Sequence, residues 1–168
     1  MAALTMEPSV NNGLYDLSNV DCTMYEQPDA GGLLPAPSIA PLGAAPLNIQ
    51  RDQPLFIDFK WVQNGALSGA ALGGVVEFQT KFFFEALGST EVPASMDLGN
   101  TVPFQAGVGF NYDPTSSPLC RITVPANTIP VGVFACTAVV QANIIGLGTA
   151  FASGYVRFPY LNVYEANI

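Results

Sequence analysis

Apolar and polar residues alternate along the chain from residue 54 onward. In PLFIDFKWVQ, the residues Leu55, Ile57, Phe59 and Trp61 fall on one side of an extended backbone. The segment VVEFQTKFFFEAL repeats this period, with aromatic residues on one side and mostly charged or amide residues on the other. A period of two residues is that of a strand with one buried side. Both segments are therefore predicted to be strands that pack on a core.

The later segments extend this pattern. TVPFQAGVGF is predicted to be a weak edge strand, because Pro103 has no N–H to donate to a central ladder. LCRITV and VGVFACTAVVQA are predicted strands joined by PANTIP, and FASGYVRF with YLNVYEANI forms one long strand or two, divided at Pro159. About seven or eight strands with turns roughly every ten residues are typical of a sandwich. We expect an all-β, antiparallel β-sandwich, immunoglobulin-like or jelly-roll-like.

The segment VPANTIPVGVFACTAVVQA resembles the strand–turn–strand unit of immunoglobulin-like sandwiches, which implies a fold but no activity. A hairpin centred on Thr128 would place Cys120 opposite Cys136, with both thiols facing the core. Two interpretations stay open: two small buried thiols, which we favour, or a cross-strand disulfide. The third cysteine, Cys22, makes the count odd and gives no disulfide framework.

The first 50 residues differ in composition from the rest. Seven of the 14 prolines lie in residues 1–54, and LLPAPSIAPLGAAPLNI alternates proline with small or branched apolar residues. Proline excludes helix here and favours polyproline II or edge strand. We therefore divide the chain into an extended acidic, Pro-rich arm (1–50) and a β-sandwich body (51–168).

Two interpretations of the arm stay open: a flexible linker, or a segment that docks on its own body or on a neighbour. Solvated linkers use serine, glycine and charged residues, whereas this one carries bulky aliphatic side chains. Those side chains favour docking and form the candidate assembly arm: Leu33, Leu34, Ile39, Leu42 and Leu47.

The charge of the chain excludes several classes of partner. Thirteen acids, five bases and no histidine give a net charge of −8. Nucleic acid is not an expected partner, because binding phosphates requires clustered Lys and Arg. Only 11% of the residues are charged, well below the typical ~25%. Part of the surface is therefore expected to be covered by another copy, a lipid or a partner.

Few residues offer catalytic or ligand chemistry. Without histidine the chain has no imidazole base, so the common Ser-His and Cys-His nucleophiles cannot form. Three scattered cysteines do not make a zinc site, and GALSGAALGG lacks the ending of a phosphate loop. We expect no enzymatic activity, and we assign no catalytic residue, cofactor, metal ligand or small-molecule substrate.

Residues 122–156 contain no charge. The stretch is long enough for one membrane-spanning helix, or it forms two strands around a turn. Gln141, Asn143 and Pro130 favour the strands, so no membrane span is expected. Strands of a sandwich usually carry charges on their solvated side. One sheet face or edge is therefore expected to be covered by another subunit or by the arm.

These observations predict a non-enzymatic structural subunit that self-assembles through its arm and uncharged sheet faces, as in a capsid, filament, tail or surface layer. Its expected partners are other copies of itself. The alternative is a module that binds carbohydrate or another surface ligand through aromatic residues near strand ends: Tyr112, Tyr155, Tyr160 and Tyr164. The segment MAALTMEPSV has neither the basic nor the apolar region of a secretory signal, so no signal peptide is expected. Three locations stay open: a virion, an extracellular appendage and an intracellular assembly.

Overall fold

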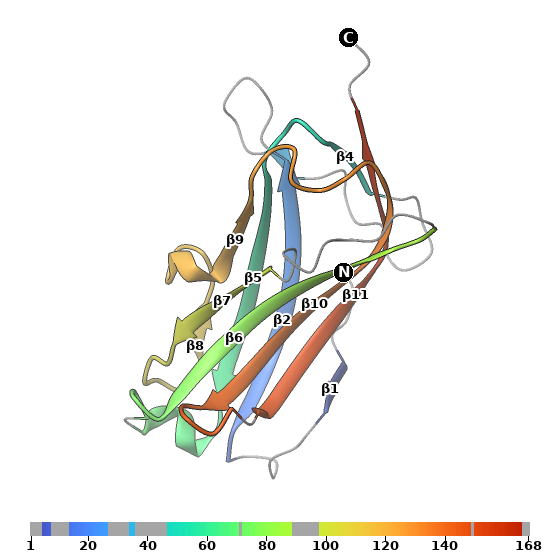
Figure 1. The fold of residues 1–168 in the computed structure, drawn as a ribbon. Coiled ribbons are helices and arrows are strands. Elements are labelled where there is room, and N and C mark those ends of the chain that lie inside the picture. The colour runs from blue at the N-terminus through green and yellow to red at the C-terminus, as the bar shows by residue number, and fades with distance from the viewer. Residues whose placement is uncertain are drawn as a thin grey trace.

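The computed structural model describes residues 5–7, 14–26, 34–35, 47–70, 72–88, 98–148 and 150–165. Among them, strands form two sheets that face each other across a shared core (Figure 1). This confirms the predicted all-β, antiparallel β-sandwich.

The larger sheet has the order β1–β11–β10–β6–β7, and β4 also pairs with β11. β1 and β4 lie along the same edge of β11, at different points of its length. Every pairing in this sheet is antiparallel except that of β4 with β11. Its strands are β1 (Thr5–Glu7), β4 (Leu47–Gln50), β6 (Val76–Ala86), β7 (Leu98–Pro103), β10 (Gly132–Ile144) and β11 (Ala150–Tyr164).

The smaller sheet has the order β3–β2–β5–β8, with β9 also paired to β5. Two short 3-10 helices, η1 (Ala66–Gly69) and η3 (Pro118–Cys120), follow β5 and precede β9. The strands of this sheet are β2 (Asp16–Glu26), β3 (Leu34–Pro35), β5 (Leu55–Asn64), β8 (Phe110–Tyr112) and β9 (Arg121–Val124).

The strand order fits the immunoglobulin-like arrangement with one change. If β2, β5, β6, β7, β9, β10 and β11 are named A to G in chain order, the sheets are A-B-E and D-C-F-G. An immunoglobulin constant domain has A-B-E-D and C-F-G, so only the fourth strand lies in the other sheet.

The core consists of the inward side chains of both sheets. Leu55, Ile57, Phe59 and Trp61 are all buried, as the two-residue period of that segment predicts. The Trp61 ring stacks on Tyr112 from β8, with centroids 4.7 Å apart. Aromatic rings therefore fill much of the space between β5, β6 and β8.

The predicted hairpin between β9 and β10 is wrong. β9 pairs with β5 in the smaller sheet, whereas β10 lies between β6 and β11 in the larger one. The intervening loop therefore crosses from one sheet to the other and does not return the chain on itself. Cys120 and Cys136 are nevertheless buried, and they are free thiols, as is Cys22.

Parts of residues 1–50 are strands of the two sheets. β2 pairs with β5 over most of its length, so it is a long strand of the sandwich itself. β4 pairs in parallel with the end of β11, and Leu47 is buried there. β1, β3 and residues 14–15 also belong to the described part of this segment, and its other residues lie outside those the structure describes.

Within the uncharged stretch, residues 132–156 form β10 and the first part of β11, joined by a turn, in agreement with the two-strand interpretation. Within the described ranges, no helix has the length and apolarity that crossing a membrane requires.

Gly65, which follows β5, is predicted to be the most sensitive glycine of this fold. Its φ is 96°, and a Cβ there would lie 2.6 Å from the carbonyl oxygen of Leu14. Gly65→Ala should lower the free energy of unfolding by about 2 kcal/mol or more, measured by urea titration. Gly73→Ala is the control, because a Cβ at Gly73 meets nothing within 4 Å. An equal loss of stability in both variants would contradict this explanation.

Candidate functional site

The candidate site is the outer face of the larger sheet, which we define as the side chains of β6, β7, β10 and β11 that point away from the core. The residues of β10 alternate between buried and half-buried or exposed, which places Thr137, Val139 and Gln141 on this face. The register sets Thr137 between Phe83 and Arg157 on the neighbouring strands. The outer face is thus a continuous surface across three long strands.

The outer face carries balanced charge in a strongly acidic chain. Lys81 and Arg157 lie on it together with Glu77 and Glu85, so the described charges on β6, β7, β10 and β11 sum to zero. The whole chain has a net charge of −8. Two copies could therefore approach through this face without the repulsion that opposes most other approaches.

Three of the four predicted ligand aromatics lie on β11. Tyr155, Tyr160 and Tyr164 are 41–49% exposed, while Val156, Phe158 and Leu161 between them are buried. The register shifts by one residue opposite Ala135, between Phe158 and Leu161. This bulge keeps Tyr160 outward along with the other two. The Arg157 guanidinium carbon lies 6.0 Å from the centroid of the Tyr155 ring.

Tyr112 does not belong with them. It is 1% exposed, so its ring is a core residue and offers no face to a ligand. Its hydroxyl donates to Oε1 of Gln63 at 3.1 Å and accepts from the N–H of Gln105 at 2.7 Å. Burial raises the pKa of Tyr112 to about 12. Tyr112 is therefore a core residue, and the prediction that it contacts a ligand is withdrawn.

The candidate assembly arm is only partly described. Leu47 is buried on β4, beside β11. The backbone of Leu34 pairs with Glu26 of β2. Leu33, Ile39 and Leu42 lie outside the described residues, and their docking on a neighbour stays a prediction. Where the arm is described, it pairs with its own sandwich.

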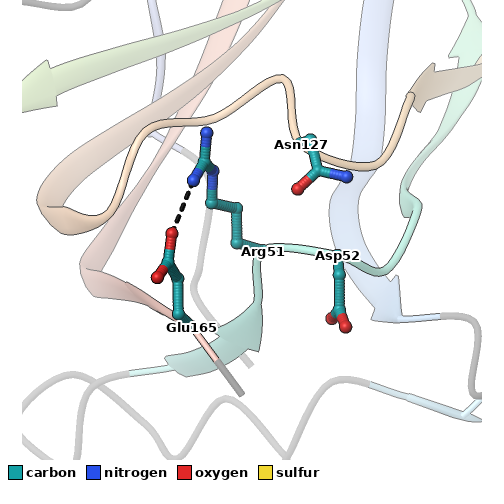
Figure 2. A pocket seen from close by; sticks show the side chains of 4 residues that line it. All are labelled: Arg51, Asp52, Asn127 and Glu165. Carbon is teal, nitrogen blue, oxygen red and sulfur yellow. Dashed lines mark hydrogen bonds and ion pairs between the residues drawn. The ribbon is translucent and has the colours of Figure 1, made fainter. Parts of the chain in front are cut away.

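A small polar pocket of ≈ 170 Å³ lies where β4, β11 and the β9–β10 loop meet. Figure 2 shows the four side chains that line it. Arg51 Nη1 lies 2.6 Å from Oε1 of Glu165, while Asp52 points away from this ion pair. Asn127 donates its backbone N–H to the carbonyl of Arg51 at 2.7 Å. The ion pair is largely exposed and contributes little to stability. These contacts join chain segments and do not place a nucleophile beside a base.

The buried thiols are poor nucleophiles. Burial raises the pKa of Cys120 to about 12, and it raises the pKa values of Cys22 and Cys136 as well. A thiol is reactive as its thiolate, which these sites disfavour. Across the described ranges, no three or more carboxylate or thiol side chains gather into a group able to hold a metal ion.

Sequence reasoning missed two exposed apolar residues of the outer face, Phe83 and Val133. Phe83 lies within a run of three phenylalanines, and only the strand period shows which of them points outward.

Comparison with known proteins adds no relative: no protein-family model, curated protein or solved structure matches the chain.

Proposed function

We propose that this protein is a non-enzymatic structural subunit that self-assembles through the outer face of its larger sheet. The supporting observation is the balanced charge of this face, set against the net charge of −8 for the chain. An assembly of the capsid, filament, tail or surface-layer type would use such a face repeatedly. Its partner is another copy of the same chain.

The residue types on this face support the proposal. Tyrosine and arginine are enriched among the residues that dominate binding energy in interfaces. The outer face presents both on β11, and Arg157 lies near the ring of Tyr155. Exposed Phe83 and Val133 add apolar surface that an interface would remove from water.

Thr137→Lys is predicted to weaken assembly. The variant places an ammonium group in the centre of the face, where burying it without a partner costs about 3 kcal/mol, or roughly 100-fold in the dissociation constant. The added positive charge reduces the net negative charge, so long-range repulsion cannot explain weaker assembly. Size-exclusion chromatography with light scattering over a concentration series measures the effect.

The matched control is Thr123→Lys. Thr123 is exposed on β9, in the smaller sheet, and its substitution changes the net charge by the same amount. It should assemble like the unmodified protein. If both variants assemble normally, or if the unmodified protein is a monomer of 17.7 kDa at all concentrations, the proposal fails.

A second candidate function is carbohydrate or surface-ligand binding, which the row of tyrosines on β11 favours. Exposed aromatic rings can stack on the apolar faces of a ligand. In this case Tyr160→Ala should abolish saturable binding on a glycan array. Tyr164→Phe, which keeps the ring, should retain it. An array without saturable binding removes this candidate.

A further inference from the structure

One end of the sandwich gathers loops that carry exposed apolar residues. This loop end consists of residues 14–15 before β2, residues 65–70 and 72–75 between β5 and β6, residues 105–109 between β7 and β8, and the turn 145–148 between β10 and β11. These segments lie together at the bottom of Figure 1. None of them contains a charged residue.

Backbone hydrogen bonds tie these loops to one another. Leu67 donates to the carbonyl of Leu14 at 2.9 Å, and Gly107 donates to that of Ser68 at 2.7 Å. Ile145 donates to Val75 at 2.8 Å, which joins the turn to the start of β6. The buried Gln63 side chain donates to the carbonyls of Gly107 and Gln105 beneath them. The loop end is therefore held in one shape before it meets a partner.

The apolar side chains at this end are unusually exposed for a loop region. Surface loops of soluble proteins are normally polar, and a contiguous exposed apolar patch marks an interaction site. Six large apolar residues here are 42–70% exposed: Leu14, Leu67, Val75, Val108, Ile145 and Leu147.

A second copy fits this surface better than a lipid does. The loops carry no Lys or Arg for anionic headgroups, and the tyrosine and tryptophan near them, Tyr15 and Trp61, are buried and cannot act as interfacial anchors. Because the chain carries a net charge of −8, two copies meet most easily where acids are few. Among the described residues, the acids that lie nearest to the loop end in sequence are Asp16 and Glu77, at its margin.

We propose that the loop end is a two-fold contact, in which it packs against the loop end of a second copy. The inference rests on the proposed self-association and adds a second surface to it. The opposite end carries Arg51, Asp52 and Glu165, which a head-to-tail contact would have to desolvate. An apolar patch meeting itself avoids that cost, as isologous contacts do. Two different contacts on one subunit let an assembly grow beyond a dimer.

The first test isolates this contact with Thr137→Lys, which is expected to weaken the outer-face contact roughly 100-fold. That variant should be a dimer, twice 17.7 kDa by light scattering. Adding Val108→Lys and Leu147→Lys should make it a monomer. Adding instead Val131→Lys and Leu87→Lys, 46% and 47% exposed and away from the loop end, should leave the dimer intact. Equal effects of the two pairs would overturn the proposal.

Cross-linking tests the symmetry of the contact. Leu147→Cys, oxidised mildly, should form a covalent dimer alone, while Val131→Cys should not. The native thiols are at most 4% exposed and should not interfere. Cross-linking only in a mixture of the two variants would indicate head-to-tail packing and overturn the two-fold contact. Sedimentation of a monomeric protein with phosphatidylcholine vesicles, lost in Val108→Lys/Leu147→Lys, would overturn it in favour of lipid.

These outcomes separate the two proposals. If unmodified protein assembles and Thr137→Lys disrupts it, but the loop-end variants change nothing, only the loop-end contact fails. If unmodified protein is monomeric throughout, both fail.

Discussion

Arg121→Met is expected to lower the free energy of unfolding by about 3 kcal/mol or more. Arg121 binds Asp58 with two hydrogen bonds, Nε to Oδ1 at 2.6 Å and Nη2 to Oδ2 at 2.7 Å. The Asp58 side chain is only 6% exposed, whereas that of Arg121 is 30% exposed. Hydrogen bonding to Asp58 raises the pKa of Arg121. Removing the guanidinium would leave the Asp58 carboxylate buried and without its ion-pair partner, because water scarcely reaches it.

The double variant Asp58→Leu/Arg121→Met should recover most of that loss. A buried ion pair often gives little net stability compared with apolar residues of similar volume, although breaking it is costly. Thr123→Met, on the same strand but exposed, should change stability by about 0.5 kcal/mol or less. Urea unfolding at neutral pH measures all three. If Arg121→Met lowers the free energy of unfolding by less than about 1 kcal/mol, the Asp58 carboxylate must be hydrated or accept a hydrogen bond from another donor when Arg121 is absent.

The sequence predicts strands best where apolar alternation is long and unbroken. β5 and β6 are of this kind, and their inward residues are buried as predicted. β2 is different: Leu17 is buried, but the next buried residue is Val20, so the alternation changes parity. The register between β2 and β5 shifts between Ser18 and Asp21, and Asn19 has a φ of 51°. This bulge hid a long strand of the sandwich inside an acidic, Pro-rich segment.

Pairing between strands was harder to predict than the strands themselves. Counting residues outward from a hairpin loop centred on Thr128 placed Cys120 opposite Cys136. The hairpin was assumed because a short loop usually joins neighbouring strands of one sheet. In the structure, Ile122 pairs with Ile57 and Cys136 with Phe84. Both arrangements bury the same side of each strand. Hydrophobic pattern therefore could not distinguish a hairpin from a crossover between sheets.

The candidate surfaces were predictable in part. The uncharged stretch indicated that one sheet face lacks charges, and β10 does present Thr137, Val139 and Gln141 outward. The neighbouring strands β6 and β11 nevertheless place four charged side chains on the same face, so it is balanced in charge and not free of charge. The loop end could not be predicted, because Leu14 and Leu67, like Val75 and Ile145, come together only through the fold. Tyr112 was misplaced because it precedes a turn cluster, and neighbours distant in sequence, Trp61 and Phe78, bury it.

Alkaline pH is expected to destabilise the protein strongly under reducing conditions. Burial raises the pKa of Cys120 from 9.0 to about 12, and it raises those of Cys22 and Cys136 from the same value. Above pH 9 the unfolded chain loses these protons while the folded chain keeps them. The stability that the neutral thiols contribute is therefore complete below pH 9 and is lost as pH rises toward 12. Each thiol contributes a slope of up to about 1.4 kcal/mol per pH unit.

Urea unfolding at intervals from about pH 8 to about pH 10.5 tests this expectation. The free energy of unfolding should be nearly constant at the lower end of this range and should fall with pH once the ordinary thiol pKa is passed. Cys120→Ala provides the control, because it removes one titrating group from the core. Its packing defect lowers stability equally at every pH, whereas the missing thiol reduces the slope by about 1.4 kcal/mol per pH unit. Stability that does not change with pH in the unmodified protein would show that water reaches the thiols, and that the core between the sheets is less closed than their burial indicates.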